Sequence, residues 1–298
     1  LHSTSRRQRQ MCIRDRTNRD DHDNPLQCAG HGDLIQTPDG GWAMVLLAGR
    51  WGSKWHNHLG RETCLLPMVW EGGWPRPANG TRCLHREEDA PWMTKAQQAP
   101  PTIITWDLNR RDWYKGFQFL RQYDPTAYRL DPEHSALVLR GGENLIQGLC
   151  PTFLGCRQQA MDCCCSTVLE FSPSGAAEAG LTVYLAPHYH YEIAACCLEG
   201  SASLVLRQTV GECLSAVTAQ IPLPSEPIRL IVKATPTRYC FYTKTRHGEI
   251  YLGCAETKLL SNETAKLFTG VFFGIYCSDP LGMAQARFRE FQYQSNDD

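Results

Sequence analysis

The chain of 298 residues is long enough for two domains or for one large β domain. The 30 Lys and Arg residues nearly balance the 31 Asp and Glu residues. The chain therefore has no strong net charge that would attract a nucleic acid or an anionic membrane. With 42% hydrophobic and 20% charged residues the composition is that of a folded globular protein, and no apolar run reaches the ~20 residues of a membrane-spanning helix. These numbers favour a local site for a neutral ligand, with neither a nucleic acid nor a membrane as partner.

Residues 1–19 are predicted to be a non-native or disordered leader. Leu1–Arg16 is rich in Arg, opens without Met and has no apolar segment, so it does not read as a secretory signal peptide. Arg6–Arg16 resembles the translation of a sequencing-adapter remnant, and a basic nucleic-acid-binding arm is the alternative. We therefore expect the native chain to begin further upstream, and we favour a cytoplasmic location over a secreted one.

Residues 20–77 are predicted to form a single antiparallel sheet. Pro38–Gly41 combines Pro with Asp-Gly between two apolar runs, which is typical of a hairpin turn. Strands are expected at Ala29–Gln36, Trp42–Ala48 and Leu59–Leu66, and Pro67–Pro75 is expected to contain a further strand and a turn at Gly72-Gly73. Three or four short strands within roughly fifty residues have the size of one propeller blade.

Residues 78–105 are predicted to be a linker. The segment is rich in Pro, contains Asn79-Gly80 and has no sustained hydrophobic period. Pro100-Pro101 is the expected boundary, because neither residue can donate to a strand ladder or sit inside a helix.

Residues 106–298 are predicted to form an all-β sandwich of two antiparallel sheets. Short strands recur at regular spacing with turn signals between them, and only Asn262–Leu267 suggests a helical turn. The later strands are expected at Gly180–Ala186, Tyr189–Cys197, Ala202–Thr209, Cys213–Ile221, Ile228–Ala234, Arg238–Thr243, Glu249–Ala255, Gly270–Cys277 and Ala286–Tyr293.

The fifteen cysteines are expected to be mostly reduced, small, buried side chains. They occur as singles and as Cys163–Cys165 and Cys196-Cys197, and neighbours on one strand point to opposite faces, so they cannot all pair. No two cysteine pairs have the spacing of a structural zinc site.

Ordered motifs in both halves of the chain resemble glycoside hydrolase family 43, in its β-xylosidase and α-L-arabinofuranosidase branch. The motifs of the first half are Gly30–Trp42, His58–Thr63 and Pro67–Pro75, and those of the second are Ala179–Tyr184, Ile221–Pro224 and Phe268–Gly274. The first set resembles the last blade of a five-bladed β-propeller. The second resembles the C-terminal concanavalin A-like, jelly-roll sandwich of these enzymes.

The resemblance implies an inverting exo-glycosidase that hydrolyses O-glycosidic bonds in hemicellulose-derived xylo- or arabino-oligosaccharides. In that family a general base, a pKa-modulating Asp and a general acid Glu surround the propeller axis, and inversion needs room for a water beside the sugar. These acids come from earlier blades and have no counterpart in this chain, so we expect the fragment alone to be inactive. No cofactor is required by the reaction; a structural calcium and a homo-oligomer are both compatible with the resemblance.

Three substrate-binding residues follow from the resemblance. His31 matches a pocket histidine that in some members belongs to a metal or water network, and Arg61 matches the arginine that reaches the innermost sugar. Phe272, with Phe273 as second choice, matches an aromatic that the sandwich inserts to close the pocket. The structural alternatives are a histidine satisfied on its strand, an ion-paired arginine and two core aromatics.

Two alternatives to a catalytic fragment stay open on the sequence alone: one is another function, and the other is that the blade does not fold by itself. The sandwich could be a non-catalytic carbohydrate-binding or interaction module, which exposed aromatics on one sheet face would support. The candidate side chains are Tyr184, Tyr189, Tyr191, Tyr239 and Tyr251. Alternatively the lone blade could fail to fold stably, because its strand edges and apolar faces lack neighbours.

Overall fold

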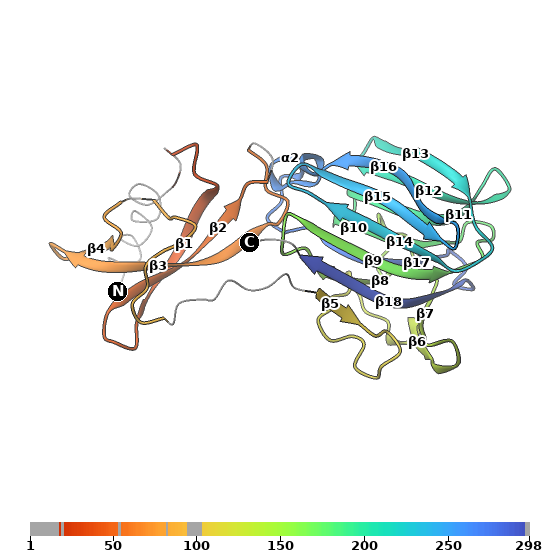
Figure 1. Cartoon of the computed structure of the whole chain (residues 1–298), viewed down its shortest axis with the longest axis horizontal. Coiled ribbons are helices and arrows are strands. Elements are labelled where there is room, and N and C mark those ends of the chain that lie inside the picture. The colour runs from red at the N-terminus through yellow and green to blue at the C-terminus, as the bar shows by residue number, and fades with distance from the viewer. Residues whose placement is uncertain (1–17, 19–20, 53–54, 82, 94–102, 296–298) are drawn as a thin grey trace.

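The computed structural model describes residues 18, 21–52, 55–81, 83–93 and 103–295, which form a small and a large β lobe (Figure 1). The predicted leader lies outside the described residues except for Asn18. Asn18 is fully buried, and its side-chain amide donates to the carbonyl oxygens of Leu26 (2.6 Å) and Leu84 (2.8 Å). Asn18 is therefore part of the small lobe, and its assignment to a leader is wrong.

The small lobe is a four-stranded antiparallel meander, as the hairpin signals predict. Its strands lie side by side in chain order: β1 (Leu26–Gln36), β2 (Trp42–Arg50), β3 (Arg61–Glu71) and β4 (Trp74–Pro77). Alternate side chains of β2 and β3 point to one face, where Leu46 and Leu66 pack with Leu84 from the segment that follows β4. We refer to this lobe as the blade.

The segment after the blade departs from the predicted linker at both ends. Leu84 is buried in the blade core, so the chain first returns across the blade. At the far end β5 (Ile103–Trp106) pairs with β18, opposing Trp106 to Phe291, so the large lobe begins before residue 106. Both pieces are too short for a hydrophobic period to reveal them.

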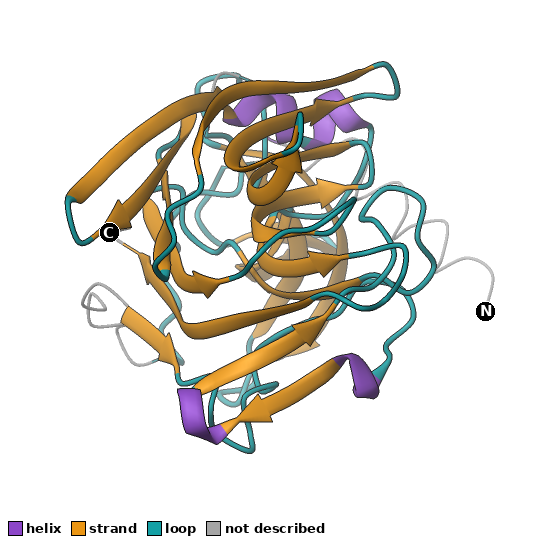
Figure 2. Ribbon diagram, turned by 90° about the vertical axis from the view of Figure 1, so that its right-hand side faces the viewer, coloured by secondary structure: helices purple, strands orange, loops and turns teal. Residues whose placement is uncertain are grey.

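The large lobe is a sandwich of a six-stranded and an eight-stranded antiparallel sheet (Figures 1 and 2). The six-stranded sheet has the order β13 (Leu214–Pro222), β12 (Ser201–Val210), β11 (Tyr189–Leu198), β10 (Glu178–Ala186), β17 (Phe272–Ser278), β8 (Thr152–Arg157). The eight-stranded sheet has the order β16 (Gly248–Glu256), β15 (Arg238–Thr245), β14 (Ile228–Ala234), β9 (Cys163–Glu170), β18 (Gln285–Ser295), β7 (Ala136–Arg140), β6 (Tyr128–Asp131), with β5 also on β18. The predicted all-β class is confirmed.

The sandwich core lies between the two sheets. Large rings from both layers meet there, and Tyr239, Phe273 and Phe288 are completely buried. The helical segments are single turns: η2 (Pro125–Ala127), η3 (Pro132–His134), η4 (Thr257–Leu260) and α2 (Asn262–Ala265). α2 confirms the helical turn expected at Asn262–Leu267, and the hydroxyl of Ser261 caps it by accepting from the amide of Thr264 (3.2 Å). None of the helices in the described ranges has the length and apolarity needed to cross a membrane.

Candidate functional site

The connection between β2 and β3 fastens the blade to the sandwich. Asn57, which is buried, organises this loop: its Oδ1 accepts from the amides of Leu59 and Gly60, both at 3.0 Å. The backbone of the same residue reaches the sandwich. Its amide donates to the carboxylate of Glu263 (2.8 Å), and its carbonyl accepts from the amide of Asn262 (2.9 Å). The loop is thus held on the turn that contains α2.

Two glycines allow the backbones of the two lobes to approach closely. Gly60 has a left-handed φ of +79°, and a Cβ there would lie 2.5 Å from the amide nitrogen of Gly270. A Cβ on Gly270 would overlap the carbonyl oxygen of Leu59. That oxygen also accepts from the guanidinium of Arg157 on β8 (2.9 Å). Only glycine fits at either position, and β3 consequently starts against the surface of the sandwich.

Arg61, the first residue of β3, meets an aromatic side chain of the sandwich. Its guanidinium carbon lies 4.4 Å from the centroid of the Phe268 ring, which is cation–π geometry. Phe268 follows α2 and is 71% exposed. Both residues line a cavity of about 170 Å³ between the lobes, together with Cys28, Trp51 and other side chains. A cation and an apolar ring thus share one small opening.

The structure places neither of the predicted phenylalanines at this opening. Phe272 begins β17 and is half-buried against a cluster that includes Phe153 and Tyr184, while Phe273 is fully buried in the sandwich core. Neither is the ring that contacts Arg61; Phe268 is. It stands in the quoted motif Phe268–Gly274, but it precedes the strand, so an argument from strand alternation could not select it.

His31 is exposed and lies in an irregular part of β1. The register with β2 shifts between Gln27 and Gly30 and again between Gly30 and Asp33. Cys28 (φ 54°) and His31 (φ 52°) take left-handed backbone conformations within these shifts. Bulges of this kind redirect side chains and are common next to active sites. No residue pattern in the sequence marks them.

The structure does not bring His31 into contact with Arg61. β2 lies between their strands, and the row Gln27, Gly49, Arg61 runs across the sheet. Two strand spacings separate the backbones of β1 and β3 by roughly 10 Å. The two predicted residues would therefore serve different parts of a ligand site.

The part of the chain that the structure describes does not complete a metal site around His31. No group of three His, Cys, Asp or Glu gathers at metal-binding distance among these residues. Calcium also prefers six or more oxygen ligands, which one imidazole does not supply. A metal at His31 stays a prediction that needs ligands from elsewhere.

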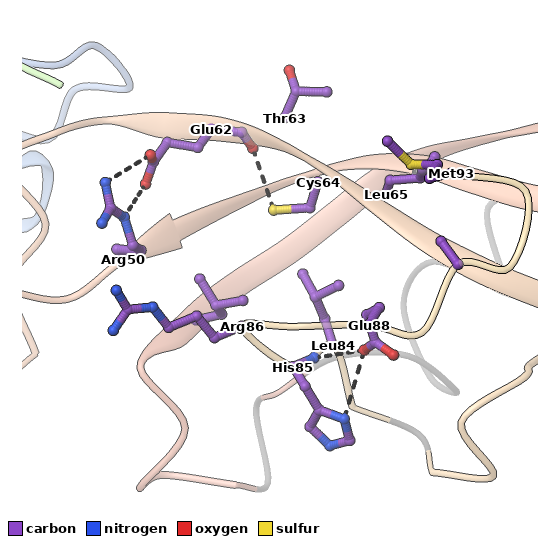
Figure 3. A pocket seen from close by; sticks show the side chains of 12 residues that line it. Arg50, Glu62, Thr63, Cys64, Leu65, Leu84, His85, Arg86, Glu88 and Met93 are labelled. Carbon is purple, nitrogen blue, oxygen red and sulfur yellow. Dashed lines mark hydrogen bonds and ion pairs between the residues drawn. The ribbon is translucent and has the colours of Figure 1, made fainter. Parts of the chain in front are cut away.

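A larger cavity of about 470 Å³ lies on the blade (Figure 3). Arg50 and Glu62 form a two-pronged ion pair at its wall, with 2.8 Å between Nε and Oε2 and 3.0 Å between Nη2 and Oε1. Arg50 also donates to the carbonyl of Gln159 in the sandwich (3.0 Å). Since both oxygens of Glu62 accept from Arg50, this carboxylate is a structural partner rather than a free acid or base. Burial raises the pKa of the nearby Cys64 thiol, which keeps it protonated.

The sandwich contains its own pair of buried acids. Glu178 on β10 and Glu192 on β11 both accept from Arg207 on β12, at 2.8 Å and 2.5 Å. Burial raises the pKa of both carboxyl groups, and Arg207 partly offsets this. Shared use of one guanidinium identifies a structural ion cluster, because neither acid is left to act on a ligand.

Most of the tyrosines proposed for a sugar-binding face are inaccessible. Tyr191 and Tyr239 are completely buried, and Tyr184 is 4% exposed. Tyr251 is exposed and Tyr189 is half-buried. The described rings therefore do not form the broad aromatic platform that the binding-module alternative requires.

A blade joined to a concanavalin-like sandwich, with an arginine and a phenylalanine at the junction, defines the class of protein. Residues 107–294 match the family described as "Beta xylosidase C-terminal Concanavalin A-like domain", and residues 4–75 match "Glycosyl hydrolases family 43". The chain belongs to glycoside hydrolase family 43. The second match begins inside the predicted leader, which agrees with the burial of Asn18.

Named relatives are consistent with this membership. The chain is 32% identical over 265 residues to a non-reducing end α-L-arabinofuranosidase of Bacteroides ovatus, covering 86% of this chain and 49% of the relative. It is 25% identical over 301 residues to a β-xylosidase of Bacillus subtilis, with 92% and 55% coverage. A solved xylan β-1,4-xylosidase from Bacillus halodurans superposes with a TM-score of 0.85 at 27% identity, covering 94% of this chain and 56% of that one. The chain spans about half the length of the curated relatives it matches.

Proposed function

We propose that this chain is the C-terminal part of an inverting exo-glycosidase that releases xylose or arabinose from hemicellulose-derived oligosaccharides. The observation that carries the proposal is the Arg61 guanidinium over the Phe268 ring, in a cavity at the junction of blade and sandwich. The names of the relatives, a β-xylosidase and an α-L-arabinofuranosidase, support the sugar class.

Each of the two residues has a chemical role that suits a sugar ligand. The planar guanidinium of Arg61 presents parallel N–H donors, which match two neighbouring hydroxyls or a catalytic carboxylate. The Phe268 ring offers an apolar face and limits the entry of water. Glu62 is held by Arg50 and is not assigned a catalytic role. As the family resemblance implies, the general acid and general base of this proposal come from earlier propeller blades.

A direct test compares this chain with a version extended upstream in its reading frame. 4-Nitrophenyl β-D-xylopyranoside and 4-nitrophenyl α-L-arabinofuranoside are the substrates, and NMR identifies the first sugar anomer released. We expect no turnover by the present chain, turnover by the extended protein and inversion at the anomeric carbon. Hydrolysis by the present chain alone would overturn the proposal that its catalytic acids lie in earlier blades.

The role of Arg61 is tested in the extended protein. Loss of a charged hydrogen-bond pair costs about 1.5–3 kcal/mol, so we expect Arg61→Ala to lower kcat/KM by roughly ten- to a hundredfold. Arg61→Lys should recover little, because a lysine cannot present the planar fork. Arg76→Ala, at an exposed position of β4, is the matched control. Full activity of Arg61→Lys would show that only the charge matters.

The location of the protein belongs to the same proposal. No disulfide joins the fourteen cysteines in the described residues, and only five of them are buried, fewer than the sequence predicted. So many accessible thiols suit a reducing compartment, which favours the cytoplasm. Cell fractionation of the native host would test this directly.

A further inference from the structure

Two cysteines face each other at the edge of the eight-stranded sheet. Cys240 on β15 and Cys254 on β16 are directly opposed in the antiparallel register, and their sulfur atoms are 2.8 Å apart. Opposed residues of antiparallel strands have Cα atoms about 4.5–5.5 Å apart, which a disulfide can span. We propose that Cys240 and Cys254 form a reversible, redox-sensitive disulfide that fastens the edge strand β16.

The sheet supplies an internal comparison for this pair. Cys164 on β9 lies in the same row, but Lys233 on β14 stands between it and Cys240. Two strand spacings, roughly 10 Å, separate Cys164 from Cys240, which exceeds the reach of a disulfide. Three thiols therefore share one row of the sheet, and geometry selects a single pair among them.

The surroundings divide the two thiols into an attacking and a resolving partner. Both side chains are half-buried, so a small oxidant can reach them. Burial opposes ionisation of Cys254, but hydrogen bonds from Cys240, Tyr251 (2.6 Å) and Arg238 outweigh it and lower the pKa of this thiol. Burial and the neighbouring sulfur raise the pKa of Cys240 to about 11. Cys254 is the thiolate that reacts first.

The chemistry balances with a low-molecular-weight disulfide such as glutathione disulfide as the oxidant. The Cys254 thiolate attacks one sulfur of the oxidant, forms a mixed disulfide and releases one glutathione thiolate. Cys240 then gives up its proton, attacks the Cys254 sulfur and releases the second glutathione. The chain loses two protons and two electrons, and the oxidant is reduced to two thiols.

The bond would act on the strand that leads to the junction between the lobes. Within the described sheet β16 pairs on one side only, with β15, and edge strands open more readily than central ones. From β16 the chain continues directly through η4 and α2, whose turn holds the blade at Asn57. A cross-link at Cys254 would limit fraying three residues before Thr257 begins η4. This inference does not depend on the proposed glycosidase function.

Trypsin provides a direct test, because cleavage after Arg238, Lys244, Arg246 and Lys258 places the two cysteines in separate peptides, 239–244 and 247–258. The native chain is equilibrated with glutathione disulfide, remaining thiols are alkylated, and the digest is analysed by mass spectrometry. We expect these two peptides to appear joined, lighter by two hydrogens than their sum, and to separate after dithiothreitol. Alkylation of both cysteines, stable glutathione adducts alone, or equal linkage of Cys240 to Cys164 would overturn the proposal.

Two variants and a second measurement, hydrogen exchange, distinguish disulfide formation from an effect of the substitution on folding. Cys254→Ser should abolish the joined peptide, whereas Cys213→Ser, at an exposed position before β13, should leave it unchanged. In the unaltered chain, oxidation should slow amide hydrogen exchange across residues 249–256, and reduction should reverse this. Exchange in β16 that is identical in the oxidised and reduced protein would refute the fastening role, whatever the variants do.

Discussion

The blade and the sandwich bury their side chains in different ways. The sandwich closes its core between two sheets of its own, and residues such as Phe273 and Phe288 are fully buried. The blade covers one face with the returning segment around Leu84, while on its sheet Ile35 and Val69 remain 43% and 41% exposed. The sandwich buries its core with its own two sheets, whereas the blade depends on other segments to cover its sheet.

The candidate site lies at the junction between the blade and the sandwich. Arg61 is positioned by the Gly60–Gly270 contact and by the loop around Asn57, both of which use the sandwich as support. We therefore expect substitutions that disrupt the junction to change the geometry of the site more than substitutions that only lower the stability of one lobe. Substitutions in the core, at the junction and at the cavity test whether the blade depends on the sandwich while the sandwich does not depend on the blade.

The largest effect is expected from Phe273→Ala. Removing a fully buried ring costs about 3–5 kcal/mol of unfolding free energy, since it leaves a cavity in the sandwich core. Because the blade relies on the sandwich, hydrogen exchange should accelerate in both lobes. Leu66→Ala, in the blade core, is the mirror variant and should accelerate exchange in the blade alone. A sandwich that weakens with Leu66→Ala would remove the asymmetry.

The second effect concerns the junction itself. Gly60→Ala forces a Cβ toward the backbone of Gly270 and a left-handed φ on alanine, so we expect a loss of about 2–4 kcal/mol in the blade transition. Gly80→Ala is a matched control, since Gly80 has a similar φ of +70° but open space around its Cβ. Thermal unfolding followed by tryptophan fluorescence measures both. Equal losses would assign the whole effect to backbone strain and none to contact with the sandwich.

The sequence predicted the sandwich well because its strands are long and sharply bounded by turns. Ile228–Ala234 is predicted and observed with identical ends, and the strands expected at Arg238–Thr243 and Glu249–Ala255 are found within two residues as β15 and β16. The blade is predicted less well. The Asp39-Gly40 turn is where the sequence places it, but Leu59–Leu66 and Pro67–Pro75 are not separate strands, because β3 runs through Pro67 to Glu71 before the turn at Gly72-Gly73. Regular alternation and turn chemistry are local properties, so residues alone can reveal them.

The site was less accessible to sequence reasoning, because it depends on contacts between distant segments. The bulges at Cys28 and His31 arise from left-handed backbone at ordinary residues, which no pattern announces. Phe268 meets Arg61 at a junction where the turn around α2 docks on Asn57. Resemblance located the motif, but the three-dimensional path of the chain decided which aromatic in it reaches the arginine.

The third prediction concerns acid and should separate the lobes by pH. Burial lowers the pKa of His190 on β11 to about 4, against 6.5 for a free imidazole. Between these values the unfolded chain binds the proton more tightly, so the free energy of unfolding falls as the pH falls from 6.5 to about 4, by roughly 3 kcal/mol at most. Above pH 6.5 this histidine contributes nothing to the pH dependence.

His190→Gln isolates that contribution. Glu178 and Glu192, whose pKa values burial raises, act in the opposite sense in both proteins, because the folded state holds their protons more tightly. The difference between the two proteins, from urea unfolding at several pH values, therefore reports on His190 together with its 3.9 Å contact to Glu192. We expect the variant to lose part of the acid sensitivity of the sandwich and to leave the blade unchanged. Parallel pH curves for the two proteins would contradict the assignment.

The smallest effect is expected from Phe268→Ala. The ring is 71% exposed and touches Arg61 through a cation–π contact, which at an exposed site is worth about 0.5–1 kcal/mol. A double-mutant cycle with Arg61→Ala measures this coupling, because each single change removes the same contact. We expect little change in either unfolding transition but a clear loss of ligand affinity in the extended enzyme. A coupling near zero, with unchanged affinity, would mean that the other contacts of the junction position the arginine without help from the aromatic ring.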